Sequence, residues 1–186
     1  MRRGIILAVG ILIILGESVA FGAVNKLQAK KDSFFISYHV YHVFHSVDGI
    51  SKNILCYIEF DSSTHMIIGV YVETGVNTFN SGNETRDKTV MKAVESDKYP
   101  DVAFQSDSIA YNSDTTMSVK GKLTFHGVPK EIVIPITVIS KERDTICDGS
   151  IDLDFDTFNV EKPALLFIPA SNTFIVKFHM VFDGRS

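Results

Sequence analysis

From residue 34 onward, the chain alternates apolar and polar residues with a period of two. In an extended chain, Ile36, Tyr38 and Val40 lie on one face, and Ser37 and His39 lie on the other. Because successive side chains of a β-strand point to opposite faces, this pattern predicts strands with one buried and one solvated face. The pattern recurs in eight runs, at residues 34–40, 53–61, 65–74, 101–110, 117–125, 131–140, 145–156 and 173–183.

Short segments rich in turn-forming residues connect these runs. Asp61-Ser62-Ser63 and His126-Gly127-Val128-Pro129 are examples. Strands joined in this way pair as sequential hairpins, and eight of them with one apolar face close into a barrel, which removes unpaired edges. We therefore predict an all-β fold, an eight-stranded antiparallel up-and-down barrel, with a two-sheet sandwich as the alternative. Pro135 falls inside a predicted strand, where its missing donor predicts a bulge or local unpairing.

One helix is predicted after the third strand. Ser81, with Glu84 three residues later, has the spacing of a capping box. The segment from Glu84 to Ser96 then carries good helix formers around its apolar residues.

The N-terminus has the layout of a secretory signal peptide. Arg2 and Arg3 precede an apolar run of about eleven residues, 5–15, and small residues follow it. A membrane-spanning helix needs about 20 apolar residues, so we expect removal of the run, not retention. We assign residues 1–23 to a signal peptide and residues 24–186 to one β-barrel domain.

Cleavage after Ala20 or after Gly22 fits equally well. We expect an exported protein, periplasmic or secreted, with no stable membrane insertion after cleavage. The formal net charge is −4, and loss of the leader makes it about −5. This mildly acidic balance argues against nucleic acid as a partner and against electrostatic docking on anionic membranes.

Cys56 and Cys147 both have the inward parity of their strands. In an oxidising compartment they could form a disulfide across the barrel. Two unpaired, buried thiols are the alternative.

The sequence contains no recognisable catalytic or metal-binding motif. His39, His42 and His45 are spaced three apart, but in one extended strand His42 points away from the other two. Gly-x-Ser-x-Gly, Cys-x-x-Cys and phosphate-loop patterns are absent from the sequence. We therefore predict no catalytic residues, no bound metal and a protein that is not an enzyme.

The inward face of the predicted barrel is almost wholly apolar. An eight-stranded barrel encloses room for side chains or for one small ligand, and parity alone does not separate these alternatives. The residues predicted to face inward are Ile36, Tyr38, Val40, Ile58, Phe60, Ile68, Val70, Val72, Phe104, Met117, Val119, Leu123, Ile134, Ile136, Leu153, Phe155, Val176, Phe178 and Met180.

Three phrases in the chain occur in order and at compatible spacing. They are GNETRDK at 82–88, KYPDVAFQS at 98–106 and GKLTFHGVPKEIVI at 121–134. Together they resemble the YceI-like family of polyisoprenoid-binding proteins, over residues 34–183. The resemblance implies a lipocalin-like barrel that holds the apolar tail of an isoprenoid or another lipid, with the helix against one end.

The resemblance also bears on individual residues. It places a histidine at the position of His42, where the ring would meet a ligand head group, and it implies that Arg86 and Asp87 latch the helix. The chain departs from the family in the segment 158–171, which we predict to cap the opening. Phe158 and Leu166 of that segment complete the predicted ligand-binding set.

The predicted function is non-enzymatic binding, storage or transport of a long apolar ligand inside the barrel. We expect no cofactor; the partner is an isoprenoid quinone, a fatty-acid-like molecule or another lipid bound as ligand. The sequence leaves open whether the chain is a monomer or a homodimer. The alternatives are an exported hydrolase or metal enzyme with a polar cluster in the barrel, and a structural module without ligand.

Overall fold

The computed structural model describes residues 24–165 and 167–183, so the predicted signal peptide lies outside the described residues. Within them the chain is all-β with one α-helix. Ten strands form one antiparallel sheet, and two short strands form a separate hairpin. The elements are β1 (Val24–Gln28), β2 (Phe35–Tyr41), β3 (Ser46–Ser51), β4 (Ile54–Asp61), β5 (Met66–Gly75), η1 (Val76–Thr78), α1 (Glu84–Ala93), β6 (Asp101–Ser113), β7 (Thr116–Phe125), β8 (Val128–Lys141), β9 (Asp144–Asp154), η2 (Asp156–Phe158), β10 (Ala164–Leu165), β11 (Ile168–Pro169) and β12 (Thr173–Asp183).

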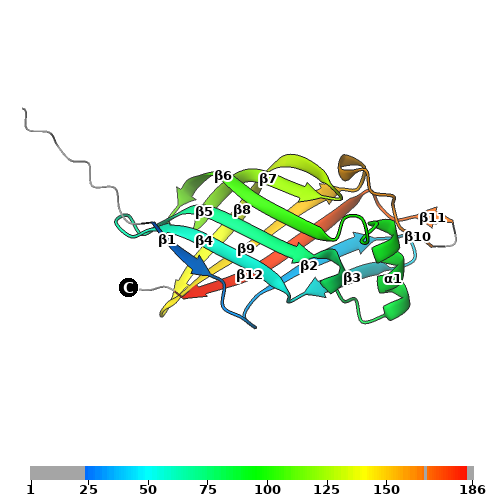
Figure 1. The fold of residues 1–186 in the computed structure, drawn as a ribbon, viewed down its shortest axis with the longest axis horizontal. Helices are drawn as coiled ribbons and strands as arrows, with labels where there is room; N and C mark the ends of the chain where they lie inside the picture. Colours follow the sequence, from blue (N-terminus) through cyan, green and yellow to red (C-terminus); the bar gives the residue numbers. More distant parts are fainter. Residues whose placement is uncertain (1–23, 166, 184–186) are drawn as a thin grey trace, which may run out of the picture.

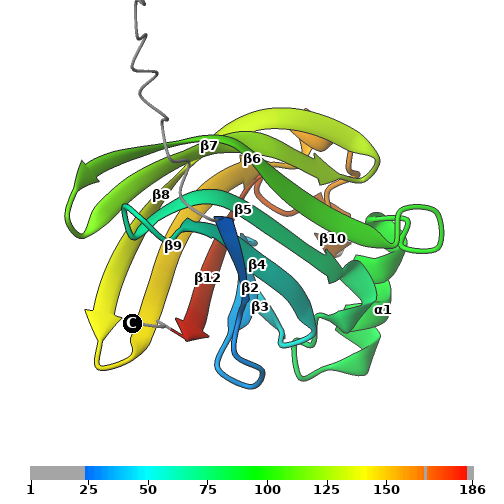
Figure 2. The same ribbon diagram turned by 60° about the vertical axis from the view of Figure 1, so that its left-hand side comes forward.

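The main sheet is a meander that curls on itself (Figures 1 and 2), with β1 and β3 at its two edges. Its strand order within the described part of the chain is β1-β4-β5-β6-β7-β8-β9-β12-β2-β3. The prediction of eight strands is therefore wrong by two, since β1 and β3 are additional. Both have weak patterns: β1 is mostly exposed, and β3 carries only Val47 and Ile50 as large apolar residues.

The segment after β1 joins one edge of the sheet to β12. The Ala29 amide donates to the Cys56 carbonyl of β4 at 2.9 Å, and the Lys30 amide donates to the Val181 carbonyl of β12 at 2.7 Å. The Lys30 ammonium also contacts Asp144 at 2.5 Å and Asp183 at 3.0 Å. Backbone donors that would otherwise be unpaired are thus satisfied where the segment after β1 meets the C-terminal end of β12.

We call the line along which the curled sheet closes the seam. The other edge strand, β3, is fastened at the far end of this seam. Ile50 of β3 exchanges backbone hydrogen bonds of 3.0 and 2.9 Å with Asn80. The buried Ser51 hydroxyl lies 2.6 Å from the Thr78 hydroxyl and 3.3 Å from the Thr74 hydroxyl. These hydroxyls satisfy one another away from water, which holds β3 against the end of β5.

A β-bulge changes the inward face of β5. Phe60 pairs with Ile67, whereas the preceding Glu59 pairs with Gly69, so Ile68 is the extra residue. The prediction that Ile68 faces inward is wrong: its side chain is 46% exposed, and Ile67 is buried in its place.

Pro135 lies where one ladder of β8 ends. It pairs with Ser118 of β7 without a register shift, whereas the ladder with β9 extends only from Ile136 to Lys141. The predicted local unpairing is confirmed on the β9 side, and no bulge forms on the β7 side. A residue without an amide hydrogen is accommodated where one partner strand has ended.

Helix α1 begins at Glu84 as predicted, but its N-cap lies two residues later than the predicted one. Asn83 is the N-cap, and its side-chain oxygen accepts the Arg86 amide at 3.0 Å. Ser81 is not the cap; its amide and hydroxyl donate to the Asp87 carboxylate in the first turn, the hydroxyl at 2.5 Å. No helix within the described residues is long and apolar enough to cross a membrane.

Phe158 provides a test of the core beside the curled sheet. Its side chain is fully buried at the end of η2 and lies against Phe125, with ring centroids 5.5 Å apart. We expect Phe158→Ala to lower the free energy of unfolding by about 3–5 kcal/mol, because it leaves an unfilled cavity. Urea denaturation measures this, with the fully exposed Phe167→Ala as the matched control. Equal stability of the two variants would contradict the described packing.

Candidate ligand cavity

The curled sheet encloses a cavity of about 530 Å³. This volume is within the range of small-molecule sites, roughly 300–1,000 Å³. Its wall is built mainly from the inward side chains of the strands, and aliphatic and aromatic groups predominate. A space of this kind favours an apolar ligand, because few of its wall atoms can replace the hydrogen bonds that a polar ligand makes with water.

Buried, polarizable side chains form the wall where the seam is closed. Cys56, Met117, Cys147, Met180 and Phe182 all line the cavity and are each at most 4% exposed. Sulfur-containing side chains adapt to irregular shapes, so this region can fit the flexible end of a ligand tail. We call these five residues the floor.

The opposite end of the cavity reaches solvent. The exposed lining residues are His45 in the β2–β3 turn, Asn83, Thr85 and Thr89 at α1, and Ala164 of β10. Figure 1 shows α1 and the β10–β11 hairpin at one end of the sheet, away from the C-terminal end of β12. We call this end the mouth.

Most of the predicted ligand-binding residues line this cavity. They are Ile36, Tyr38, Val40, His42, Ile58, Val70, Val72, Phe104, Met117, Leu123, Ile134, Ile136, Leu153, Phe155, Val176, Phe178 and Met180. That these side chains contact a ligand stays a prediction.

Four other predicted residues do not line the cavity, and Leu166 lies outside the described residues. Ile68 is turned outward by the bulge, and Phe60 is only partly buried at the same irregularity. Val119 and Phe158 are fully buried, yet they pack into the core instead of facing the space. Strand parity identifies the inward face, but it does not show how far along that face the cavity extends.

Glycines beside large aromatic residues help to shape the wall. Tyr38 lies over Gly49 on the neighbouring strand, and Phe178 lies over Gly149. A Cβ placed on Gly49 would come within 2.4 Å of the Tyr38 ring, and one on Gly149 within 2.2 Å of the Phe178 ring. The missing side chains therefore let these rings lie flat against the sheet, which leaves the centre of the curl open.

Helix α1 contributes a wall that the strand pattern did not predict. Arg86, Val90 and Val94 line the cavity at a spacing of four residues, which places them on one face of the helix. The apolar residues of this face were visible in the sequence, but their partner was not. The chain places the helix at the mouth end of the sheet (Figure 1), and its inner face becomes part of the cavity wall.

Two polar groups on the wall near the mouth have free hydrogen-bonding capacity. The Tyr38 hydroxyl has no hydrogen-bond partner among the described residues, and burial raises the Tyr38 pKa to about 12, with the Asp87 charge adding to the shift. Arg86 donates from Nε to the Ser81 hydroxyl at 2.9 Å and from a terminal nitrogen to the Ser81 carbonyl at 2.6 Å. Within the described chain Arg86 forms no ion pair, so it latches the helix as predicted and still presents a cation to the cavity.

His39, His42 and His45 were expected to lie in one extended strand. The structure differs from this expectation. The chain reverses at His42–His45, whose backbones exchange hydrogen bonds of 3.1 and 3.2 Å. The rings of His42 and His45 consequently lie 5.7 Å apart, whereas His39 contacts Asp48 at 2.6 Å.

His42 lines the cavity, but its nitrogens are already engaged. Nδ1 accepts the Phe44 amide at 3.3 Å, so Nε2 carries the proton and donates to the Ile168 carbonyl at 2.9 Å. The head-group role of His42 stays a prediction, and a head group would have to compete with these two hydrogen bonds. His42 connects the β2–β3 turn to β11.

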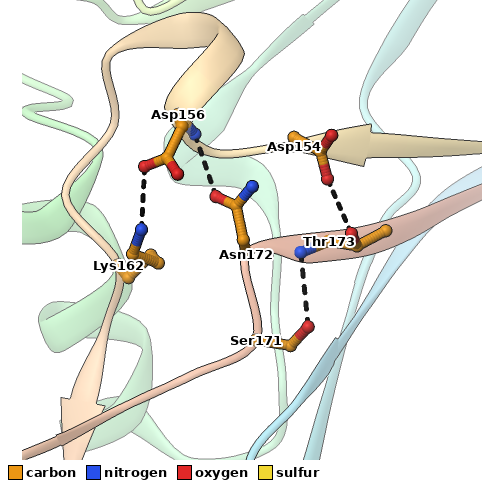
Figure 3. Close-up of polar contacts among 6 residues, drawn as sticks. All are labelled: Asp154, Asp156, Lys162, Ser171, Asn172 and Thr173. Carbon is orange, nitrogen blue, oxygen red and sulfur yellow. Dashed lines mark hydrogen bonds and ion pairs between the residues drawn. The ribbon is translucent and has the colours of Figure 1, made fainter.

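The segment between η2 and β12 forms part of the mouth, and a polar network fastens its base (Figure 3). The Asp156 amide donates to the Asn172 side chain at 3.1 Å, and Lys162 contacts the Asp156 carboxylate at 2.8 Å. The Thr173 hydroxyl donates to Asp154 at 2.6 Å. Pro163, Ala164 and Ala170 of this segment line the cavity, which agrees with its predicted place at the opening. Phe167 of the same segment does not line the cavity, because it is fully exposed at the hairpin tip.

A buried histidine ties the end of α1 to the sheet. His126 lies at the β7–β8 turn, and its ring nitrogens are 3.1 Å from the Phe158 carbonyl and 2.8 Å from the Glu95 carboxylate. The Tyr99 ring packs 4.3 Å from the His126 ring and lies over Gly127, which has a positive φ of 71°. The second and third sequence phrases thus meet in space and hold the helix end, which is a structural role.

Cys56 and Cys147 are both buried free thiols, so the unpaired alternative describes the structure. Burial raises the pKa of each thiol to about 12, from an ordinary value of 9.0. Among the described residues there is also no group of three or more His, Cys, Asp or Glu side chains that could hold a metal ion.

The sequence has relatives with which it can be compared. Residues 26–182 match the YceI-like domain. A UPF0312 protein of Pseudomonas putida is 28% identical over 134 residues, which cover 70% of this chain and 70% of the relative. A UPF0312 protein of Pseudomonas syringae pv. tomato is 25% identical over 180 residues, covering 92% and 91% of the two chains.

Solved structures share the fold at lower identity. BcnA of Burkholderia cenocepacia has a TM-score of 0.74 at 21% identity, covering 82% of this chain and 98% of BcnA. A polyisoprenoid binding domain from Saccharophagus degradans, implicated in plant cell wall breakdown, has a TM-score of 0.66 at 12% identity. That alignment covers 86% of this chain and 98% of the domain.

The buried thiols lead to two measurable expectations. Because the thiolate is the reactive form, Cys56 and Cys147 should react with a thiol reagent far more slowly in the folded protein than after unfolding. An exposed cysteine introduced by Ser140→Cys is the control and should react at once in the folded protein. Rapid labelling of native Cys56 or Cys147 would contradict their placement.

The same thiols should make stability fall in alkaline solution. Below pH 9 both folded and unfolded thiols are protonated; between pH 9 and about 12 the unfolded chain loses protons that the folded chain keeps. The free energy of unfolding should therefore decrease as the pH rises through this window. Replacing both residues by Ala should weaken this decrease, as measured by denaturation at a series of pH values; an unchanged slope would count against raised thiol pKa values.

Proposed function

The chain belongs to the YceI-like family, and from its fold and cavity we propose that it binds, stores or transports a long apolar ligand. The ligand class we propose is a polyisoprenoid, such as a quinone tail, or another amphiphilic lipid. The observation that carries the proposal is the cavity itself, with an apolar wall, a buried floor and polar groups near an open mouth. The polyisoprenoid binding domain that shares the fold supports the choice of ligand class.

The wall chemistry explains how such a ligand would be held. Each methylene removed from water stabilises the complex by about 0.8 kcal/mol. A tail of several isoprene units would therefore favour the cavity over water strongly enough to make its free concentration negligible. Its other environment is a membrane, which is equally apolar, so transfer between bilayer and cavity has a small net free energy. Loading and release are both feasible under that balance, which suits a carrier or a store.

The polar groups near the mouth give the ligand a direction. Tyr38 and Arg86 can donate hydrogen bonds to a carbonyl or an anionic head group, while the tail extends toward Met117, Met180 and Phe182. The raised pKa keeps the Tyr38 hydroxyl protonated at neutral pH, and Arg86 stays charged. A head group placed here would exchange hydrogen bonds with water for hydrogen bonds with Tyr38 and Arg86.

The proposal includes export through the signal peptide at residues 1–23, so the mature domain would work in the periplasm or after secretion. It also gives the chain a binding function, not a catalytic one. A structural module without ligand is less well supported, because such a module would fill its interior with side chains. An exported hydrolase or metal enzyme would need a cluster of catalytic groups facing the cavity, and its apolar wall favours the binding role.

The proposal predicts a lipid that copurifies with the native protein. Organic extraction of the mature protein from its own host, followed by mass spectrometry, should give one apolar lipid in near-stoichiometric amount. Val72→Phe adds bulk inside the cavity and should abolish this recovery, because the ring occupies the space that the tail needs. Val133→Phe is the matched control, since Val133 is 55% exposed. Empty extracts, together with no uptake of isoprenoid quinones in vitro, would contradict the proposal.

A second prediction concerns the head group. Tyr38→Phe keeps the ring over Gly49 but removes the hydroxyl. We expect the affinity for an isoprenoid quinone to fall by roughly 3- to 10-fold, the value of one hydrogen bond. The affinity for squalene, which has no polar head, should not change. Equilibrium titration of both ligands measures this, and an equal loss for the two would show that Tyr38 contributes packing alone.

A further inference from the structure

Exposed apolar side chains gather at the mouth of the cavity. Val43 and Phe44 lie in the β2–β3 turn and are 72% and 56% exposed, and Tyr41 precedes them. Phe167 lies in the β10–β11 turn and is fully exposed, and Ile168, the first residue of β11, follows it. We call these five residues the rim. Exposed apolar groups are individually common on proteins, but a cluster around a binding site marks a surface of contact.

The two turns of the rim are held together, although about 125 residues separate them in the sequence. The His42 ring donates to the Ile168 carbonyl at 2.9 Å, and the Ser171 amide donates to the Tyr41 carbonyl at 2.8 Å. At the base of the β10–β11 hairpin, the Ala170 amide donates to the Pro163 carbonyl at 2.8 Å. The rim therefore projects from a connected support, so its apolar side chains can act together.

The rim is continuous with the cavity. His42 and His45, which flank Val43 and Phe44, line the cavity, and so do Pro163, Ala164 and Ala170, which flank Phe167. A surface that met the rim would therefore also meet the opening through which a ligand passes.

The charge of the rim segments differs from that of the chain. Segments 41–47 and 163–171 contain no Asp or Glu, although the whole chain has a formal net charge of −4. Segment 163–171 also contains no Lys, Arg or His. Carboxylates would oppose insertion among lipid head groups, because they would lose hydration there. The composition suits shallow insertion of apolar groups and gives no cluster of cations for anionic lipids.

We propose that the rim docks on a lipid bilayer, with Phe44 and Phe167 inserted among the lipids, so that the cavity mouth faces the membrane. This inference rests on the proposed function, because a carrier of an apolar ligand must collect that ligand where it is dissolved. Docking would let the tail move from bilayer to cavity without crossing water. The shallow contact is reversible, because two phenylalanines bury far less apolar area than a membrane-spanning helix.

Flotation with phosphatidylcholine vesicles tests the proposal. The full-length mature protein should float with the vesicles, and high salt should not release it, because the contact is apolar. The double variant F44S/F167S should bind vesicles at least roughly tenfold more weakly, since each buried phenylalanine contributes substantially to transfer from water. The control V133S/I139S removes two exposed apolar residues from β8 and should bind like wild type.

A second measurement separates this inference from the proposed function. Binding of an isoprenoid quinone presented in detergent micelles should be equal for wild type and F44S/F167S, which also shows that the variant is folded. Wild-type protein that binds the quinone in detergent yet stays unbound to vesicles would overturn the docking proposal alone. Wild-type protein that floats, takes up no quinone and yields an empty organic extract would overturn the proposed function alone. A protein dimer that F44S/F167S dissociates, without flotation, would show that the rim contacts a second copy instead and would overturn the lipid assignment.

Discussion

The structure depends on how the curled sheet joins its own edges. A meander with one apolar face must cover that face, and curling covers it only if the edge strands find partners. Here the short segment at Ala29 and Lys30 connects β4 to β12, and the contacts of Ile50 and Ser51 hold β3 against the end of β5. Without both attachments, the sheet would open and its apolar wall would face water. The cavity is thus a consequence of the seam.

Once the seam is closed, side-chain size decides whether the interior is filled. The inward aromatic rings of Tyr38 and Phe178 lie flat over glycines, so the strands come close without their side chains meeting in the centre. Helix α1 then covers part of the open end, and the His126–Glu95 contact fixes where the helix stops. The polar contacts at the base of the β10–β11 hairpin position the other side of the mouth. Wall, floor and mouth are therefore set by different interactions, each visible in a few residues.

The sequence predicted the eight longer strands of the sheet and many of the strand residues that line the cavity, because period-two alternation reports directly which side chains point inward. It also predicted the helix, from its capping and helix-forming residues. Prediction from the sequence failed where the direction of a side chain or the course of the chain depends on a partner strand. The bulge that turns Ile68 outward exists only in the pairing of β4 with β5, and the chain reversal at His42–His45 has no glycine or proline to mark it. β3 has too few apolar residues to be recognised alone. The cavity face of α1 could not be predicted either, since a helix pattern shows an apolar face without showing what it covers.

In the proposed function, an apolar cavity, a polar mouth and an apolar rim form one path for a lipid between membrane and protein. The most direct test of this proposal is an electron-density map of the protein purified from its own host without delipidation. We predict continuous elongated density that begins beside Tyr38 and Arg86 and ends among Met117, Met180 and Phe182. A space filled by repositioned side chains, or occupied by ordered water alone, would contradict the claim that this protein is built to hold a lipid.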